Sequence, residues 1–174
     1  MASYYYLMSS LPTLNANGQM PFRYDAFLDM CRSSVSESTY KRLEELNVNS
    51  SEGALMAEWS KFYRILSDEL TYQRSLRLGR NCPAPADRDS DATRIASAAL
   101  NEKNPLTAEK LLLELQFEKL DGLTNMHWFD EISLIGYALK LKLMERRTVF
   151  DHDRGKAEFG RIFDYLQQQI EDFG

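Results

Sequence analysis

The sequence has few of the residues that mark catalysis, metal binding or export. Its two cysteines, Cys31 and Cys82, lack the Cys-x-x-Cys spacing of a zinc or redox site. The N-terminus has no basic region followed by an apolar one, so we expect no secretory signal and two reduced, space-filling thiols in a cytoplasmic protein. Neither a glycine-rich phosphate loop nor a Gly-x-Ser-x-Gly turn occurs. We therefore expect no catalytic residue and no cofactor.

Long uncharged runs and an excess of positive charge are also missing. In the C-terminal half no uncharged run is longer than Ile132 to Leu139, which is far short of the about 20 residues that span a membrane. The net charge of -5 argues against nucleic-acid binding, which requires basic residues to displace the counterions of the phosphates. We expect no membrane span, no nucleic-acid partner and no small-molecule substrate.

The composition is that of a folded globular protein, with 44% hydrophobic and 27% charged residues. Alternating strand patterns with turn signals between them are essentially absent, so we predict an all-α fold. The whole chain, residues 1–174, is expected to form one helical domain. The proline- and aspartate-rich crossing at 81–90 is the one place where a sub-boundary could lie.

The longest predicted helix runs roughly from residue 52 to residue 79. It should be on the order of 40 Å long, and therefore should set the long axis of the molecule, with Gly79 ending it. Its apolar residues repeat at steps of three and four, which is typical of a helix. These residues are Leu55, Trp59, Phe62, Leu66 and Leu70.

Three further helices are predicted after residue 104. Asn104 and Pro105 form a strong start, with an N-cap side chain followed by a proline, and Gly122 is expected to end the first of them. The second should open near Trp128 or Asp130. The apolar positions are Leu106, Leu113, Phe117 and Leu120 in the first helix, Ile132, Ile135, Leu139 and Leu143 in the second, and Phe159, Phe163, Leu166, Ile170 and Phe173 in the third.

The N-terminal half contributes shorter elements. We expect a helix or an extended segment at 3–11, a loop at 12–21, a helix at 22–32 and a small alanine-rich helix at 89–100 that can pack closely against a neighbour. Ser34 and Glu37 fit a capping box that would open a helix to about Leu46. The sum is an elongated bundle of about seven or eight helices with one long central helix.

His127 and His152 are the only histidines, and both have acidic neighbours that could suggest a metal site. No His-Glu-x-x-His or Glu-x-x-His spacing places two ligands on one helix face, so we expect no metal site. A small enzyme that uses one of these histidines is the weakest of the functional alternatives. The neighbours are Asp130, Glu131, Asp151 and Asp153.

Arg74, Arg77 and Arg80 follow at steps of three and should roughly share one face at the end of the long helix. Cations at a helix C-terminus complement its dipole, which is the simpler interpretation. The alternative is a contact for an acidic partner surface, because arginine pairs well with carboxylates. For Lys140, Lys142, Arg146 and Arg147 the dipole interpretation is preferred, since Asp130 and Glu131 balance the other end of that helix.

Tyr4, Tyr5 and Tyr6 are three successive aromatic rings. Neither a helix nor a strand can bury all three on one face, so at least one should be exposed or contact a partner. Tyrosine suits an interface because its ring is apolar and its hydroxyl is polar. Core packing and partner contact stay open as alternatives.

The run Tyr4-Tyr-Tyr-Leu-Met-Ser-Ser-Leu-Pro12 is similar to the opening of a bacterial family of uncharacterised proteins encoded among V-type (archaeal-like) ATPase genes. Three later motifs resemble the same family, and the middle of the chain matches only loosely. They are Asn104-Pro-Leu-x-Ala-Glu-Lys110 with Phe129-Asp-Glu-Ile, then Gly136-Tyr-Ala-Leu-Lys-Leu-Lys-Leu-Met-Glu-Arg146, then Arg154-Gly-Lys156 with Phe159 behind it.

The family in turn resembles a shortened form of the all-helical protein that links the rotating central stalk of the V-type ATP synthase to its membrane ring. The resemblance implies a non-catalytic central-stalk or accessory subunit of a V/A-type ATPase. Its partners would be the other ATPase subunits, and it would lie in the cytoplasm, peripheral to the inner membrane through that complex. A helical scaffold or assembly factor, for the ATPase or for another complex, is the alternative.

Overall fold

The computed structural model describes residues 4–148 and 159–163, and every regular element within them is helical, which confirms the predicted all-α fold. Segment 3–11, for which two conformations were open, contains a short helix. Residues 159–163 are helical as well. The longer stretch contains α1 (Tyr4–Ser10), α2 (Tyr24–Cys31), α3 (Glu37–Glu44), α4 (Ala54–Arg77), α5 (Ser90–Asn101), α6 (Pro105–Thr124) and α7 (Glu131–Thr148).

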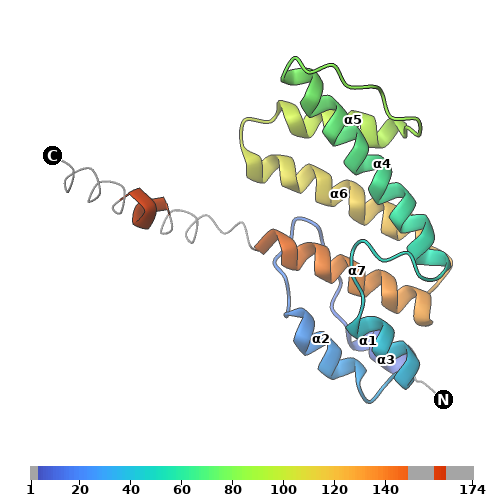
Figure 1. Ribbon diagram of the computed structural model, residues 1–174. Coiled ribbons are helices and arrows are strands. Elements are labelled where there is room, and N and C mark those ends of the chain that lie inside the picture. The colour runs from blue at the N-terminus through green and yellow to red at the C-terminus, as the bar shows by residue number, and fades with distance from the viewer. Residues whose placement is uncertain (1–3, 149–158, 164–174) are drawn as a thin grey trace.

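Helix α7 lies between two groups of helices (Figure 1). It contacts α1, α2 and α3 on one side and α6 on the other, while α4, α5 and α6 pack on one another. Leu134, Leu139 and Leu141 of α7 are fully buried, and these positions do not share one helix face. A helix that is apolar on several faces is buried in the interior, so α7 is the element that both groups share.

Helix α4 is the longest of the helices in residues 4–148, as predicted, and its 24 residues give a length of about 36 Å. Its predicted apolar stripe is confirmed, with Leu70 only partly buried. The helix begins after Gly53 and ends in a Schellman motif at Gly79, whose φ of 67° is readily adopted by glycine. The N–H of Arg80 donates to the Ser75 carbonyl, and the N–H of Gly79 donates to the Leu76 carbonyl.

The crossing at 81–90 is held against α4 by an ion pair between the buried Glu69 and Arg88, whose side chain is 43% exposed. The carboxylate of Glu69, only 1% exposed, accepts two hydrogen bonds from Arg88, at 2.9 and 2.7 Å, and one from Gln73 at 2.7 Å. The Arg88 guanidinium holds the pKa of that carboxyl below its usual value. Beyond the crossing, Ala92 and Ala99 of α5 belong to the same core as the rest of the described helices.

Two local predictions were wrong. The N-cap of α3 is Ser36, whose hydroxyl accepts from the Thr39 N–H at 3.2 Å, so Ser34 and Glu37 do not form the expected capping box. Helix α6 starts at the predicted Asn104 cap but passes through Gly122 to Thr124. A glycine inside a helix costs only about 1 kcal/mol relative to alanine, which the buried face of α6 can offset.

Only the beginning of the third predicted C-terminal helix lies in the described part of the chain. Phe159 and Phe163 are helical and exposed there, whereas Leu166, Ile170 and Phe173 lie outside the described residues. Within the described ranges, no helix is both long enough and apolar enough for a membrane crossing.

Candidate functional site

Large apolar side chains are exposed where α1 meets the turn between α6 and α7. Tyr5 and Tyr6 of α1 point outward, which confirms that the tyrosine run is not wholly buried. The Tyr5 ring lies 4.8 Å from Phe129 and 5.6 Å from Tyr6, and Trp128 lines a groove together with Met8 of α1. We call this group the aromatic surface. Its members are Tyr5 (58% exposed), Tyr6 (76%), Met126 (85%), Trp128 (72%) and Phe129 (48%).

A chain of hydrogen bonds fixes α1 against α3 and α7 beneath this surface. The buried Thr39 hydroxyl donates to Glu131 at 3.1 Å, so its single proton is used there. It therefore accepts from the Tyr4 hydroxyl at 3.2 Å and from Ser36 at 2.9 Å. Arg42 of α3 donates to the same Glu131 oxygen at 2.7 Å. Tyr4 is thus the anchored member of the tyrosine run.

The start of α7 is closed by a reciprocal cap that also holds the turn carrying Trp128 and Phe129. The Asp130 carboxylate accepts from the Ser133 N–H at 2.9 Å, and the Ser133 hydroxyl accepts from the Asp130 N–H at 3.2 Å. The second Asp130 oxygen lies 2.5 Å from Nδ1 of His127. Burial raises the pKa of the Asp130 carboxyl, but these partners outweigh it and the pKa lies below its usual value.

His127 therefore contacts one carboxylate and orients the turn. Among the described residues, no group of three or more histidine, cysteine, aspartate or glutamate side chains could hold a metal ion. Glu131 is occupied by Thr39 and Arg42. The other residues weighed for a metal, His152, Asp151 and Asp153, lie outside the described residues.

The structure does not bring the three predicted arginines to one place. Arg74 lines a groove formed with α6 and α7. Arg77 donates to the carbonyl of Leu100 in the last turn of α5. Arg80 lies beyond the helix, after Gly79. The expected common face does not extend to Arg80, because the helix ends before that residue.

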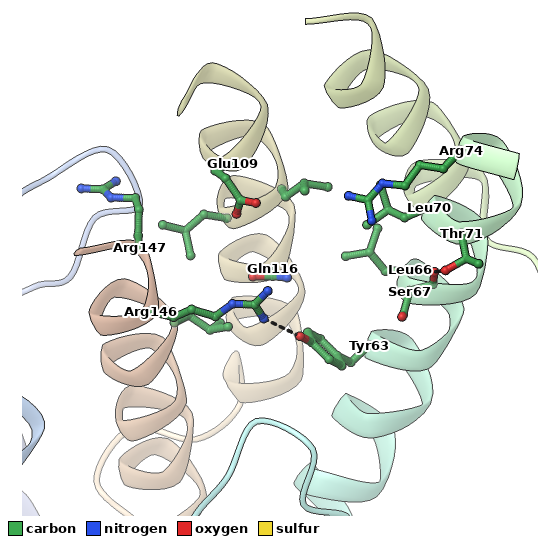
Figure 2. A pocket seen from close by; sticks show the side chains of 13 residues that line it. Tyr63, Leu66, Ser67, Leu70, Thr71, Arg74, Glu109, Gln116, Arg146 and Arg147 are labelled. Carbon is green, nitrogen blue, oxygen red and sulfur yellow. Dashed lines mark hydrogen bonds between the residues drawn. The ribbon is translucent and has the colours of Figure 1, made fainter. Parts of the chain in front are cut away.

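The groove that contains Arg74 has a volume of about 170 Å³ and lies between α4 and α7, with α6 at its floor (Figure 2). Arg74, Arg146 and Glu109 project into it from α4, α7 and α6, and Arg146 donates to the Tyr63 hydroxyl at 2.8 Å. Arg147 points to the other side and donates to the Gly18 carbonyl at 2.8 Å. Arg146 and Arg147 therefore each donate a hydrogen bond to a particular oxygen, in addition to complementing the helix dipole at the end of α7. We call this the arginine groove.

Sequence reasoning missed part of both surfaces. From the sequence, Met126 is not singled out, Trp128 is given only as a possible helix start and Phe129 only as part of a family motif. A turn that carries large apolar residues in place of polar ones is nevertheless itself a signal. The arginine groove joins three helices that are far apart in the sequence, and no local pattern could indicate it.

No family model matches this chain, and no curated protein and no solved structure shows significant similarity to it. The resemblance to the ATPase-associated family therefore stays a prediction based on the sequence motifs.

Proposed function

We propose that this chain is a non-catalytic helical subunit of a V/A-type ATPase that binds other subunits through the aromatic surface. It serves in the central stalk or as an accessory part that connects the rotor to the membrane ring. In this role it binds protein subunits and requires no cofactor, metal or nucleic acid.

The exposure of the aromatic surface is the observation that carries the proposal. Single exposed apolar residues are common on folded proteins, whereas large contiguous apolar patches mark interaction sites. Tyr5 contacts both Tyr6 and Phe129, so these three exposed rings are contiguous. Tyrosine, tryptophan, phenylalanine and methionine are enriched at protein interfaces, and tyrosine and tryptophan are frequent among the residues that dominate binding energy. All five side chains of the aromatic surface are of these types.

The aromatic surface is held in position before any partner binds. Tyr4 is fixed through Thr39 to Glu131, and the cap at Asp130 fixes the turn. A surface that is ordered in advance loses less conformational entropy on binding. A part that transmits force between subunits also requires stiff elements, and α4 and α7 are long helices packed into one core.

The assignment to an ATPase rests on the sequence motifs. Tyr5 and Tyr6 lie in the N-terminal motif, and Phe129 begins the motif Phe129-Asp-Glu-Ile, so the resemblance and the aromatic surface share residues. We place the protein in the cytoplasm, held at the inner membrane by the ATPase.

The alternative is an assembly factor that touches the ATPase transiently. The same aromatic surface would serve it, because an exposed apolar surface that is covered only in the complex suits both roles. Stoichiometry separates them: a stalk or accessory subunit stays in the purified, active enzyme in a fixed ratio, and an assembly factor leaves it.

Affinity purification from the native cells tests the proposal. The tagged wild-type chain should recover ATPase subunits, identified by mass spectrometry, and the double variant Tyr6→Ser/Trp128→Ser should recover less than about a tenth as much, given the weight of such residues in binding. The control is Leu76→Ser/Leu78→Ser, which changes exposed apolar residues at the end of α4. Circular dichroism checks that all variants are folded. Recovery of no ATPase subunit by the wild type, or equal recovery by both double variants, contradicts the proposal.

A further inference from the structure

The accessible lining of the arginine groove is polar. Its leucines are buried, apart from the partly buried Leu70, and they close the floor of the groove. Covering them with an apolar group would remove little further apolar surface from water, so the groove suits a small charged ligand. The exposed residues along its walls are Ser67, Thr71, Arg74 and Arg146.

The charged side chains that project into the groove are not paired with one another. Arg74 and Arg146 project from opposite walls, and Glu109 projects from α6 at the floor (Figure 2). Within the described part of the chain, Arg74 and Glu109 have no hydrogen bond or ion pair, and Arg146 donates only to the neutral Tyr63 hydroxyl. Two guanidinium groups and one carboxylate leave an excess of positive charge, which attracts an anion.

Phosphate matches the donors of the groove better than a carboxylate does. Two parallel N–H groups of one arginine are enough to bind a carboxylate, whereas the oxygens of a phosphate accept from several directions at once. The Tyr63 hydroxyl accepts from Arg146 at 2.8 Å and therefore keeps its own proton for a ligand. Ser67 and Gln116 add further neutral donors from α4 and α6. The donors thus come from all three helices of the groove.

We propose that the arginine groove binds hydrogen phosphate, with Arg74 and Arg146 donating to its oxygens and Glu109 accepting from its hydroxyl. The groove volume of about 170 Å³ is several times the roughly 30 Å³ that one water molecule occupies in the liquid, so an ion of this size fits.

Glu109 determines which anion is preferred. At about pH 8 hydrogen phosphate keeps one proton, whereas sulfate has none and a phosphate ester has lost its second proton near pH 6. The Glu109 carboxylate accepts a hydrogen bond from a protonated oxygen but repels a fully ionised group. Glu109 therefore selects inorganic phosphate among anions of similar size.

Isothermal titration calorimetry of the purified full-length chain with sodium phosphate, at constant ionic strength and about pH 8, tests the proposal. It requires no other subunit, so its result is independent of the ATPase assignment. Two charge-assisted contacts should give a Kd of about 1 mM or lower. Arg74→Gln should raise the Kd by about tenfold or more. Because Arg74 has no partner within the described residues, urea unfolding should show unchanged stability of this variant.

The matched control is Arg80→Gln, which changes an arginine that does not line the groove and should leave the Kd unchanged. An equal Kd for the wild type and Arg74→Gln overturns the proposal. The absence of saturable binding by the wild type up to about 10 mM phosphate overturns it as well.

The preference among anions tests Glu109 separately. Sulfate should bind the wild type about tenfold more weakly than phosphate, and Glu109→Gln should remove this difference because an amide can donate to a sulfate oxygen. Equal binding of the two anions by the wild type overturns the proposal in favour of unselective anion attraction. Tighter binding of adenosine monophosphate overturns it in favour of a phosphate ester, and tighter binding of acetate overturns it in favour of a carboxylate.

Discussion

The Tyr5 ring packs on the Phe129 ring with centroids 4.8 Å apart and ring planes at 52°. This pair joins the first helix of the chain to the turn that precedes α7. Both rings remain about half exposed, so the contact builds a surface and does not complete a core. The hydrogen bonds of Thr39 hold Tyr4, the residue before Tyr5, to Glu131 at the start of α7.

Thr39→Val should destabilise the protein by about 1–3 kcal/mol, because the buried hydroxyl joins Tyr4, Ser36 and Glu131 and the substitution removes all three of these hydrogen bonds. Urea unfolding measures the change. The matched control is Thr107→Val in α6, at a half-buried position, which should stay within about 0.5 kcal/mol of the wild type. Equal effects of both substitutions would show that the polar chain contributes nothing to stability.

Gly136→Ala should destabilise the protein by about 1–3 kcal/mol, although alanine is the better helix former. Gly136 is buried where α7 passes α6, and an added Cβ would lie 2.6 Å from Cγ2 of Thr124. Thr124→Ser removes that methyl group and keeps the hydroxyl, which donates to the Leu120 carbonyl. The double variant Gly136→Ala/Thr124→Ser should therefore recover most of the loss.

Gly122→Ala is the control for this pair. It lies in α6, and an added Cβ there would meet nothing within 4 Å. The substitution should stabilise the protein by up to about 1 kcal/mol through helix propensity alone. If Gly136→Ala stabilised the protein as well, the close approach of α6 and α7 would be refuted.

The lowered pKa of Glu69 predicts that the stability of the protein depends on pH. Because Arg88 lowers the pKa of Glu69 in the folded state, its stabilising effect is complete above the ordinary value of 4.5 and is lost as the pH falls through the lower folded-state pKa. Glu69→Gln should cost about 2 kcal/mol at pH 7, and the difference from the wild type should shrink towards pH 3. Urea unfolding at both pH values measures it.

The control is Asp87→Asn, which removes an exposed ion pair with Arg64. Surface pairs of this kind contribute at most about 1 kcal/mol. A Glu69→Gln effect that stayed constant from pH 7 to pH 3 would mean that shape, and not charge, accounts for the role of Glu69.

The helices themselves could largely be predicted from local patterns. The apolar stripe from Leu55 to Leu66 and the N-cap at Asn104 depend only on residues that are close in the sequence, and the structure confirms both. The predictions at Ser34 and Gly122 were wrong because two hydroxyls compete for one cap and because a single glycine is a weak stop when Leu120, one turn before the end of α6, is buried.

The candidate site could be predicted only in part. The tyrosine run showed that a ring must be exposed, but its contact with Phe129 depends on how α1 packs beside α7, which no local spacing encodes. The same holds for Glu69, which a helix pattern alone would place with the solvent-facing charges. Glu69 can be buried because Arg88 pairs with it. Tertiary packing of the crossing at 81–90, and not a local pattern, brings Arg88 to α4.

The central claim is that the aromatic surface is covered by another subunit of the ATPase. Hydroxyl-radical footprinting of the free protein and of the purified, active ATPase measures this directly. We predict that oxidation of Tyr6 and Trp128 falls by about tenfold in the complex, as expected for side chains at the centre of an interface, while oxidation of Leu78 stays unchanged. Oxidation of Tyr6 and Trp128 in the complex at the rate of the free protein would contradict the claim.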